Sequence, residues 1–133
     1  MNSTYRPSKF LWSAILLCIL VLLAHELLGA PMVLPALSEA ELPVKVVWLH
    51  HFSWHVGSIA MIAMIALYFL STQKPENLSM AVIATAMSVG FALLGISLAI
   101  YGDSALWGTP APYAWTIVAI LGTLGIVRTR RTG

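Results

Sequence analysis

Four long apolar segments leave this chain few folds. They run over residues 10–29, 46–71, 79–101 and 110–127. A helix that crosses the hydrocarbon core of a bilayer needs about 20 mostly apolar residues, and each segment is close to that length. In lipid every backbone N–H and C=O must find a partner inside the protein. Single apolar segments of this length satisfy that requirement as helices. We therefore expect an all-α integral membrane four-helix bundle, with residues 1–133 forming a single membrane domain.

The composition excludes an ordinary soluble domain. Charged residues make up 9% of the chain and hydrophobic residues 59%, whereas soluble domains carry about 25% charged residues. The net charge of +2 comes from basic residues near the ends of the segments and not from a basic patch, so no nucleic-acid partner is expected. The expected surroundings are the lipid bilayer, with a membrane-protein partner or a homo-oligomer as a further contact.

Charged residues outside the apolar segments predict the orientation. Basic residues flank one side of the four segments: Arg6, Lys9, Lys74, Arg128, Arg130 and Arg131. The other side carries Lys45 against Glu39, Glu41 and Asp103. Because cytoplasmic loops are enriched in Lys and Arg, both termini should be cytoplasmic, as in a multi-pass protein of the cell membrane, here the bacterial inner membrane.

Turn-forming residues separate the segments. Pro31, Pro35 and Pro43 should break the helix and form the first connection, while residues 74–77 and 102–110 form the other two. A competing interpretation makes residues 1–30 a cleaved signal peptide, because a basic start is followed by an apolar run and small residues. Pro31 would directly follow that cut, which disfavours it.

All four histidines lie in two short windows inside apolar segments. His25 stands beside Glu26, and His50, His51 and His55 follow in the second segment. A charged Asp, Lys or Arg at the centre of a membrane helix costs roughly 2.5–3.5 kcal/mol on insertion scales, so ionisable residues there tend to mark working sites. In antiparallel neighbouring helices the two windows share one level near the outer face.

The spacing of these residues favours a metal site. His51 and His55 are four apart and therefore share one helical face, an arrangement that supplies two ligands to a metal ion. With His25 and Glu26 the set would hold zinc, iron or copper through three nitrogens and a carboxylate. Residues expected to orient these ligands are His50, Ser58 and Asp103.

Three other interpretations use the same residues. A haem could be bound between His25 and either His51 or His55 as axial ligands. Without a cofactor, the His25 and Glu26 pair could serve as acid and base toward a lipophilic substrate. Histidines near a membrane boundary also act as amphipathic anchors, with no further role.

Two short motifs carry a family resemblance. The segment His25-Glu26-Leu27-Leu28-Gly29 and the segment Trp54-His55-Val56-Gly57-Ser58 resemble small bacterial four-helix inner-membrane proteins of unassigned function. The resemblance covers the first half of the chain. It implies the four-helix topology and names no reaction.

The expected function is a His/Glu site near the outer membrane face that binds a transition metal or haem, for redox or hydrolytic chemistry or as a cofactor-holding subunit. Whether the protein is an enzyme stays open. One alternative is a non-catalytic accessory subunit of a larger membrane complex. Another is a small transporter that uses the histidines to relay protons or metal ions.

Overall fold

The computed structural model describes residues 5–132, and within this range the chain is helical with no strand. Its elements are α1 (Lys9–Ala24), the π-helical turn η1 (His25–Gly29), α2 (Ala30–Glu39), α3 (Val44–Ser71), the 3-10 turn η2 (Pro75–Asn77), α4 (Leu78–Tyr101), the 3-10 turn η3 (Ser104–Gly108) and α5 (Ala111–Thr132).

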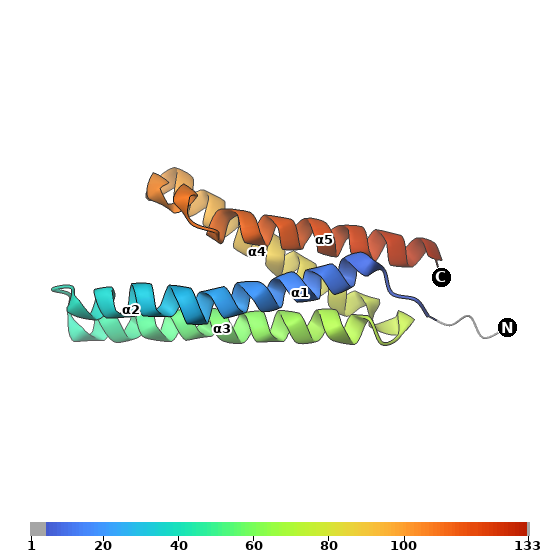
Figure 1. The fold of residues 1–133 in the computed structure, drawn as a ribbon, viewed down its shortest axis with the longest axis horizontal. Coiled ribbons are helices and arrows are strands. Elements are labelled where there is room, and N and C mark those ends of the chain that lie inside the picture. Colours follow the sequence, from blue (N-terminus) through green and yellow to red (C-terminus); the bar gives the residue numbers. More distant parts are fainter. Residues whose placement is uncertain (1–4, 133) are drawn as a thin grey trace.

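The elements form two helical pairs. In the first pair α1, η1 and α2 run on as one helical rod, and α3 returns beside it (Figure 1). In the second pair α4 and α5 pack against each other and against α3 and α1. The two pairs lie together at the end of the molecule that holds both termini, and they diverge at the other end (Figure 1).

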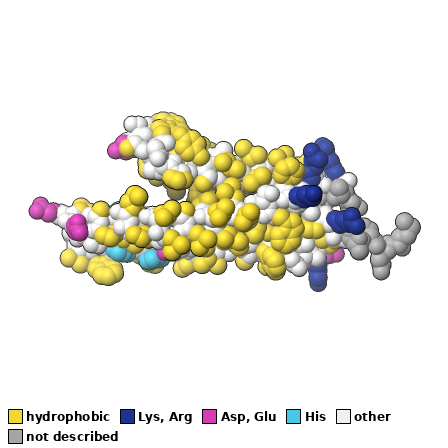
Figure 2. Space-filling model, viewed as in Figure 1, with side chains coloured by type: hydrophobic (Ala, Val, Ile, Leu, Met, Phe, Trp, Pro, Cys, Tyr) yellow, Lys and Arg dark blue, Asp and Glu magenta, His cyan; other side chains and the backbone are white. Residues whose placement is uncertain are grey.

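Four helices are long and apolar enough to cross a membrane, as in a multi-pass membrane protein. They are Lys9–Glu39, Val44–Ser71, Pro75–Tyr101 and Ala111–Arg131. Lys and Arg side chains gather at the end that carries the termini, while acidic side chains lie at the tips of the opposite end (Figure 2). We refer to these as the basic end and the outer end.

The expected helix break at Pro31 and Pro35 is wrong, because α2 continues through both residues to Glu39. Proline removes one backbone donor and strains the preceding turn. Here the π-helical turn precedes the prolines, and the N–H of Ala30 bonds to the carbonyl of His25. Such local adjustments let a membrane helix pass a proline. Only Ala40–Pro43 separate the first rod from α3.

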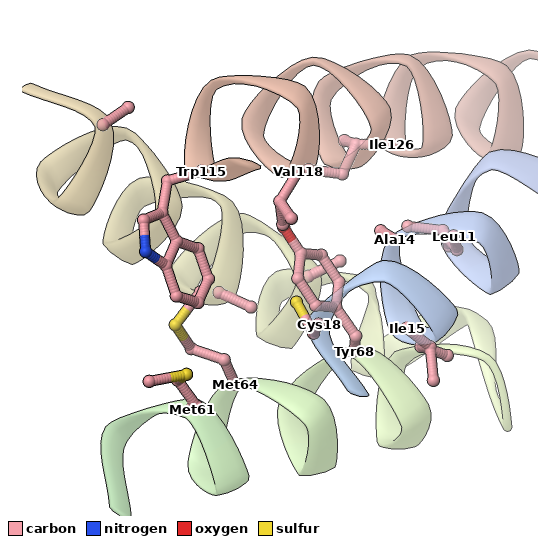
Figure 3. Packing of buried hydrophobic residues seen from close by; sticks show 13 residues of the cluster. Leu11, Ala14, Ile15, Cys18, Met61, Met64, Tyr68, Trp115, Val118 and Ile126 are labelled. Carbon is pink, nitrogen blue, oxygen red and sulfur yellow. The ribbon is translucent and has the colours of Figure 1, made fainter. Parts of the chain in front are cut away.

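The buried core lies in the basic half of the molecule. Cys18 of α1, Met64 and Tyr68 of α3 and Val118 of α5 are fully buried there (Figure 3). By contrast, no residue of η1 or α2 is buried. The outer half of the first pair is therefore a two-helix hairpin that α4 and α5 leave largely uncovered.

Small residues let the helices approach closely in this core, as is common in membrane bundles. A side chain at Gly122 of α5 would overlap the Tyr68 hydroxyl and Thr85 Oγ1. A Cβ at Gly125 would lie 2.6 Å from Cδ2 of Leu11. The Tyr68 hydroxyl is 3.0 Å from Thr85 Oγ1 and 3.4 Å from Ser88 Oγ, which ties α3 to α4.

Candidate functional site

Polar side chains meet where the π-helical turn faces α3. Adjacent residues of an α-helix differ by about 100 degrees, so His25 and Glu26 would not both be expected to face one neighbour. The π turn places one more residue in a turn, and such turns occur frequently at functional sites. Both side chains reach α3, one at Trp54 and the other at Ser58.

The His25 ring packs flat on the indole of Trp54. The ring centroids are 4.0 Å apart and the planes differ by 10°. Nε2 of His25 lies 3.3 Å from the Trp54 carbonyl oxygen, to which it donates. Nδ1 has no hydrogen-bond partner within residues 5–132. With 21% of the side chain exposed, His25 keeps one ring nitrogen for a ligand.

Glu26 is held by the same two helices. Its Oε1 accepts a hydrogen bond from the Ser58 hydroxyl, and Nε2 of His25 lies 3.8 Å away from it. Ser58 is buried, whereas the Glu26 side chain is 34% exposed. Hydrogen bonds to a charged acceptor are roughly twice as strong as neutral ones. We call this cluster of His25, Glu26 and Ser58 the His–Glu–Ser site.

Trp54 forms one wall of the His–Glu–Ser site. Its indole lies against the π turn, where a Cβ at Gly29 would come within 3.0 Å of Cη2 of the ring. A Cβ at Gly57 would lie 3.8 Å from Nε2 of His25, which is ordinary contact. Trp54 Nε1 is buried and has no hydrogen-bond partner among the described residues. Native proteins rarely leave a buried donor unpaired.

The predicted metal set is not assembled. Within residues 5–132 no group of three or more His, Cys, Asp or Glu side chains could hold a metal ion. His25 lies level with Gly57, and His51 is six residues farther toward the outer end, about 9 Å along the helix. The histidine cluster expected from the sequence is therefore wrong in this structure, because His51 lies at a different level from His25 and the nearer His55 is exposed and joins no such group.

The remaining histidines occupy other surroundings. Nε2 of His51 is 3.4 Å from Ser38 Oγ of α2, and its ring centroid is 5.3 Å from that of Trp48. His50 donates from Nδ1 to the carbonyl of Val46, one turn back in its own helix, at 2.8 Å. His55 is exposed.

Two of the residues expected to orient the metal ligands are thus elsewhere. His50 bonds to its own helix, and Asp103 accepts from the Ala105 N–H at 2.8 Å at the start of η3. Ser58, in contrast, bonds directly to Glu26.

Sequence reasoning missed Trp54 as a site residue. Its position four residues before Ser58, on the same helical face, was the available signal.

An imidazole, a carboxylate and a hydroxyl converging from two helices can hold a polar group by hydrogen bonds and can exchange a proton with it. No protein-family model, curated protein or solved structure matches this chain.

Proposed function

We propose that this chain is a four-span protein of the bacterial inner membrane with both termini in the cytoplasm. The gathering of Lys and Arg at the end that carries both termini supports this orientation (Figure 2). On this orientation, His25 lies 16 residues after Lys9, about 24 Å along the helix. That depth is inside the hydrocarbon core, whose thickness is about 30 Å, and in its outer half.

At that depth the His–Glu–Ser site is the working site of the protein in our proposal. It binds the polar group of a lipophilic ligand, and His25 and Glu26 exchange a proton with that group. The observation that carries the proposal is the convergence of His25, Glu26 and Ser58 from two helices within an otherwise apolar helix pair. Ionisable groups in membrane segments are costly and usually functional.

A bound metal ion is the competing form of this proposal. His25 and Glu26 supply two ligands, whereas catalytic zinc sites use three protein ligands. A haem held by two histidines would need His51, which lies against Ser38, or His55, which is exposed, to oppose His25. A metal-free site for a polar group uses the side chains as they stand, and we therefore place it first.

The test is chemical analysis of what the purified protein carries. The protein is extracted in mild detergent, its organic extract is examined by mass spectrometry, and its metal content and absorption spectrum are recorded. The same is done for Glu26→Gln, which keeps side-chain size, and for His25→Asn, which keeps a polar side chain, and both changes remove a proton-exchanging group. His50→Asn is the matched control, because His50 is exposed and bonds within its own helix.

We expect a near-stoichiometric lipophilic molecule in the wild type and in His50→Asn, and its loss from the two site variants. A stoichiometric metal or haem band that disappears in His25→Asn would replace this proposal with the metal form. Wild-type protein free of both, purified under conditions that retain bound cofactors, would contradict a ligand site.

A specific observation also favours an accessory-subunit role. The rod from Lys9 to Glu39 has 31 residues, about 46 Å of helix, and is longer than the hydrocarbon core. Its outer part and the facing part of α3 carry large exposed apolar side chains, namely Met32, Trp48, Leu49 and Phe52. Exposed apolar patches beyond the bilayer mark protein contacts.

The accessory role predicts a stable complex with another membrane protein in mild detergent. Trp48→Ser and Phe52→Ser should release that partner, while Ile120→Ser on the exposed face of α5 should not. Recovery of the chain without any other protein, from native membranes in mild detergent, would exclude this role.

A further inference from the structure

Two polar groups on one flank of α3 and η1 have unused hydrogen-bonding capacity. Oε2 of Glu26 has no hydrogen bond within the described residues, and this side chain is 34% exposed. His55 is exposed and makes no hydrogen bond, ion pair or ring contact in the part of the chain that the structure describes. One group is an acceptor, and the other is a donor when its ring carries a proton on the outward nitrogen.

These two groups lie on the same flank at nearly the same depth. His55 precedes Ser58 by three residues, so both lie on one face of α3, about 4.5 Å apart along the axis. Ser58 in turn holds Glu26. Around them the flank is apolar and exposed, with Ile59 and Ile62 on α3 and Leu27 on η1.

Neither Oε2 of Glu26 nor the His55 ring has a hydrogen-bond partner among the described residues of one copy. The ion pair of Glu26 is with His25 and not with His55. In hydrocarbon, ionisable side chains face a cavity or pair with one another, and an unpaired polar group costs several kcal/mol. The flank therefore needs a neighbour that presents a donor to Glu26 and an acceptor to His55 at one depth.

We propose that this neighbour is a second copy of the chain, related by a twofold axis along the bilayer normal. Such an axis keeps every residue at its own depth and makes the interface self-complementary. His55 of each copy then bonds to Glu26 of the other, which gives two reciprocal pairs. The apolar side chains of Ile59 and Ile62 pack around these pairs and exclude lipid.

The experiment is cysteine crosslinking in native membranes. Cys18 is fully buried and is first replaced in a Cys18→Ala background. Ile59→Cys places a thiol in the proposed interface, one turn from His55, at a position that is 66% exposed. Ile120→Cys, on the exposed surface of α5 and 54% exposed, is the matched control. Crosslinking is started with a membrane-permeant oxidant, and products are identified by mass.

We expect a product of twice the chain mass for Ile59→Cys and little product for Ile120→Cys. Adding His55→Ala removes both reciprocal pairs and should lower the yield roughly fivefold to tenfold, the effect of two interhelical hydrogen bonds in a membrane. Because His55 is exposed and unbonded, this variant keeps the fold of one copy. Glu26→Gln, which retains an acceptor for Ser58, should lower the yield in the same direction.

Equal crosslinking at positions 59 and 120, or a yield that His55→Ala and Glu26→Gln leave unchanged, would overturn the dimer. A crosslinked product of a mass other than twice the chain would assign the flank to a different protein and also overturn it. The proposal goes beyond the ligand site, since crosslinking requires no ligand. A ligand lost in His25→Asn together with absent crosslinking would leave the ligand site standing and remove only the dimer.

Discussion

The imidazole of His25 lies flat on the indole of Trp54, with the ring centroids 4.0 Å apart and the planes 10° from parallel. The contact joins the π-helical turn to α3 through two residues that are 29 positions apart in the chain. It also holds Nε2 of His25 on the Trp54 carbonyl and 3.8 Å from Glu26. The contact therefore fixes the position of the His25 ring between the two helices.

Removing the His25 ring should weaken the hairpin. Aromatic pairs contribute about 0.5–1.5 kcal/mol beyond their buried area, so His25→Ala should lower the free energy of unfolding by at least that amount. Unfolding in mixed detergent micelles with denaturing surfactant measures the change. His50→Ala is the control, because surface substitutions of this kind usually stay within about 0.5 kcal/mol. Equal effects for the two variants would show that the stacking contributes nothing to stability.

The hydrogen bond from Ser58 to Glu26 should show energetic coupling. Ser58→Ala leaves the carboxylate without its donor, at a cost of about 1.5–3 kcal/mol for a bond to a charged group. In Glu26→Gln the acceptor is neutral, and the same serine substitution should cost less. A double-mutant cycle over the two positions should give a coupling energy of about 0.5–3 kcal/mol. Additive effects would mean that the bond does not stabilise the fold.

Two glycines of α5 should tolerate no side chain. A Cβ at Gly122 would overlap Tyr68 and Thr85, and one at Gly125 would lie 2.6 Å from Leu11. Overpacking of a tight core costs about 1–3 kcal/mol, so either glycine-to-alanine change should destabilise the bundle by that amount.

Gly90 offers the matched control on α4, because nothing lies within 4 Å of a Cβ placed there. Gly90→Ala should be neutral or stabilise the helix by up to about 1 kcal/mol, through helix propensity alone. Thermal unfolding in detergent compares the three variants. A loss at Gly90 as large as at Gly125 would contradict the packing argument.

The buried hydroxyl of Tyr68 should contribute more to stability than the exposed hydroxyl of Tyr101. Tyr68→Phe removes the contacts to Thr85 and Ser88 and should cost about 0.6 kcal/mol, with an upper limit near 1.7, as for interhelical hydrogen bonds in membranes. Tyr101→Phe, at a position 88% exposed, should leave stability unchanged. Folding equilibria of the two variants in one detergent provide the measurement.

The proposed orientation predicts which loops reagents can reach. In the Cys18→Ala background, Ser104→Cys in η3 should react with a membrane-impermeant maleimide in intact cells. Gln73→Cys, between α3 and η2, should react only after the membrane is permeabilised. Both positions are exposed, so access differs by side of the membrane alone. The opposite pattern would reverse the orientation.

How far the candidate site could be predicted depended on the kind of interaction. His25, Glu26 and Ser58 were identifiable because polar residues in apolar helices are costly and conspicuous. Trp54 was not, since a tryptophan near a membrane boundary is an ordinary anchor. The partnership of His51 and His55 with His25 was predicted from their depth and from the four-residue spacing of His51 and His55 on one helical face. That prediction assumed a regular α-helix in the first segment. It therefore did not include the π-helical turn, which changes the direction of the side chains that follow Ala24 in this helix.

The sequence by itself determined that the described chain would be helical, with four helices long and apolar enough to cross a membrane. That follows from local physics, since apolar runs of this length can satisfy their backbone only as helices. Only the tertiary structure decided which side chains meet. Contacts such as Glu26 with Ser58 depend on helix rotation and register. Those are set by close packing around Gly29, Gly122 and Gly125 and by one π-helical turn, none of which apolar periodicity encodes.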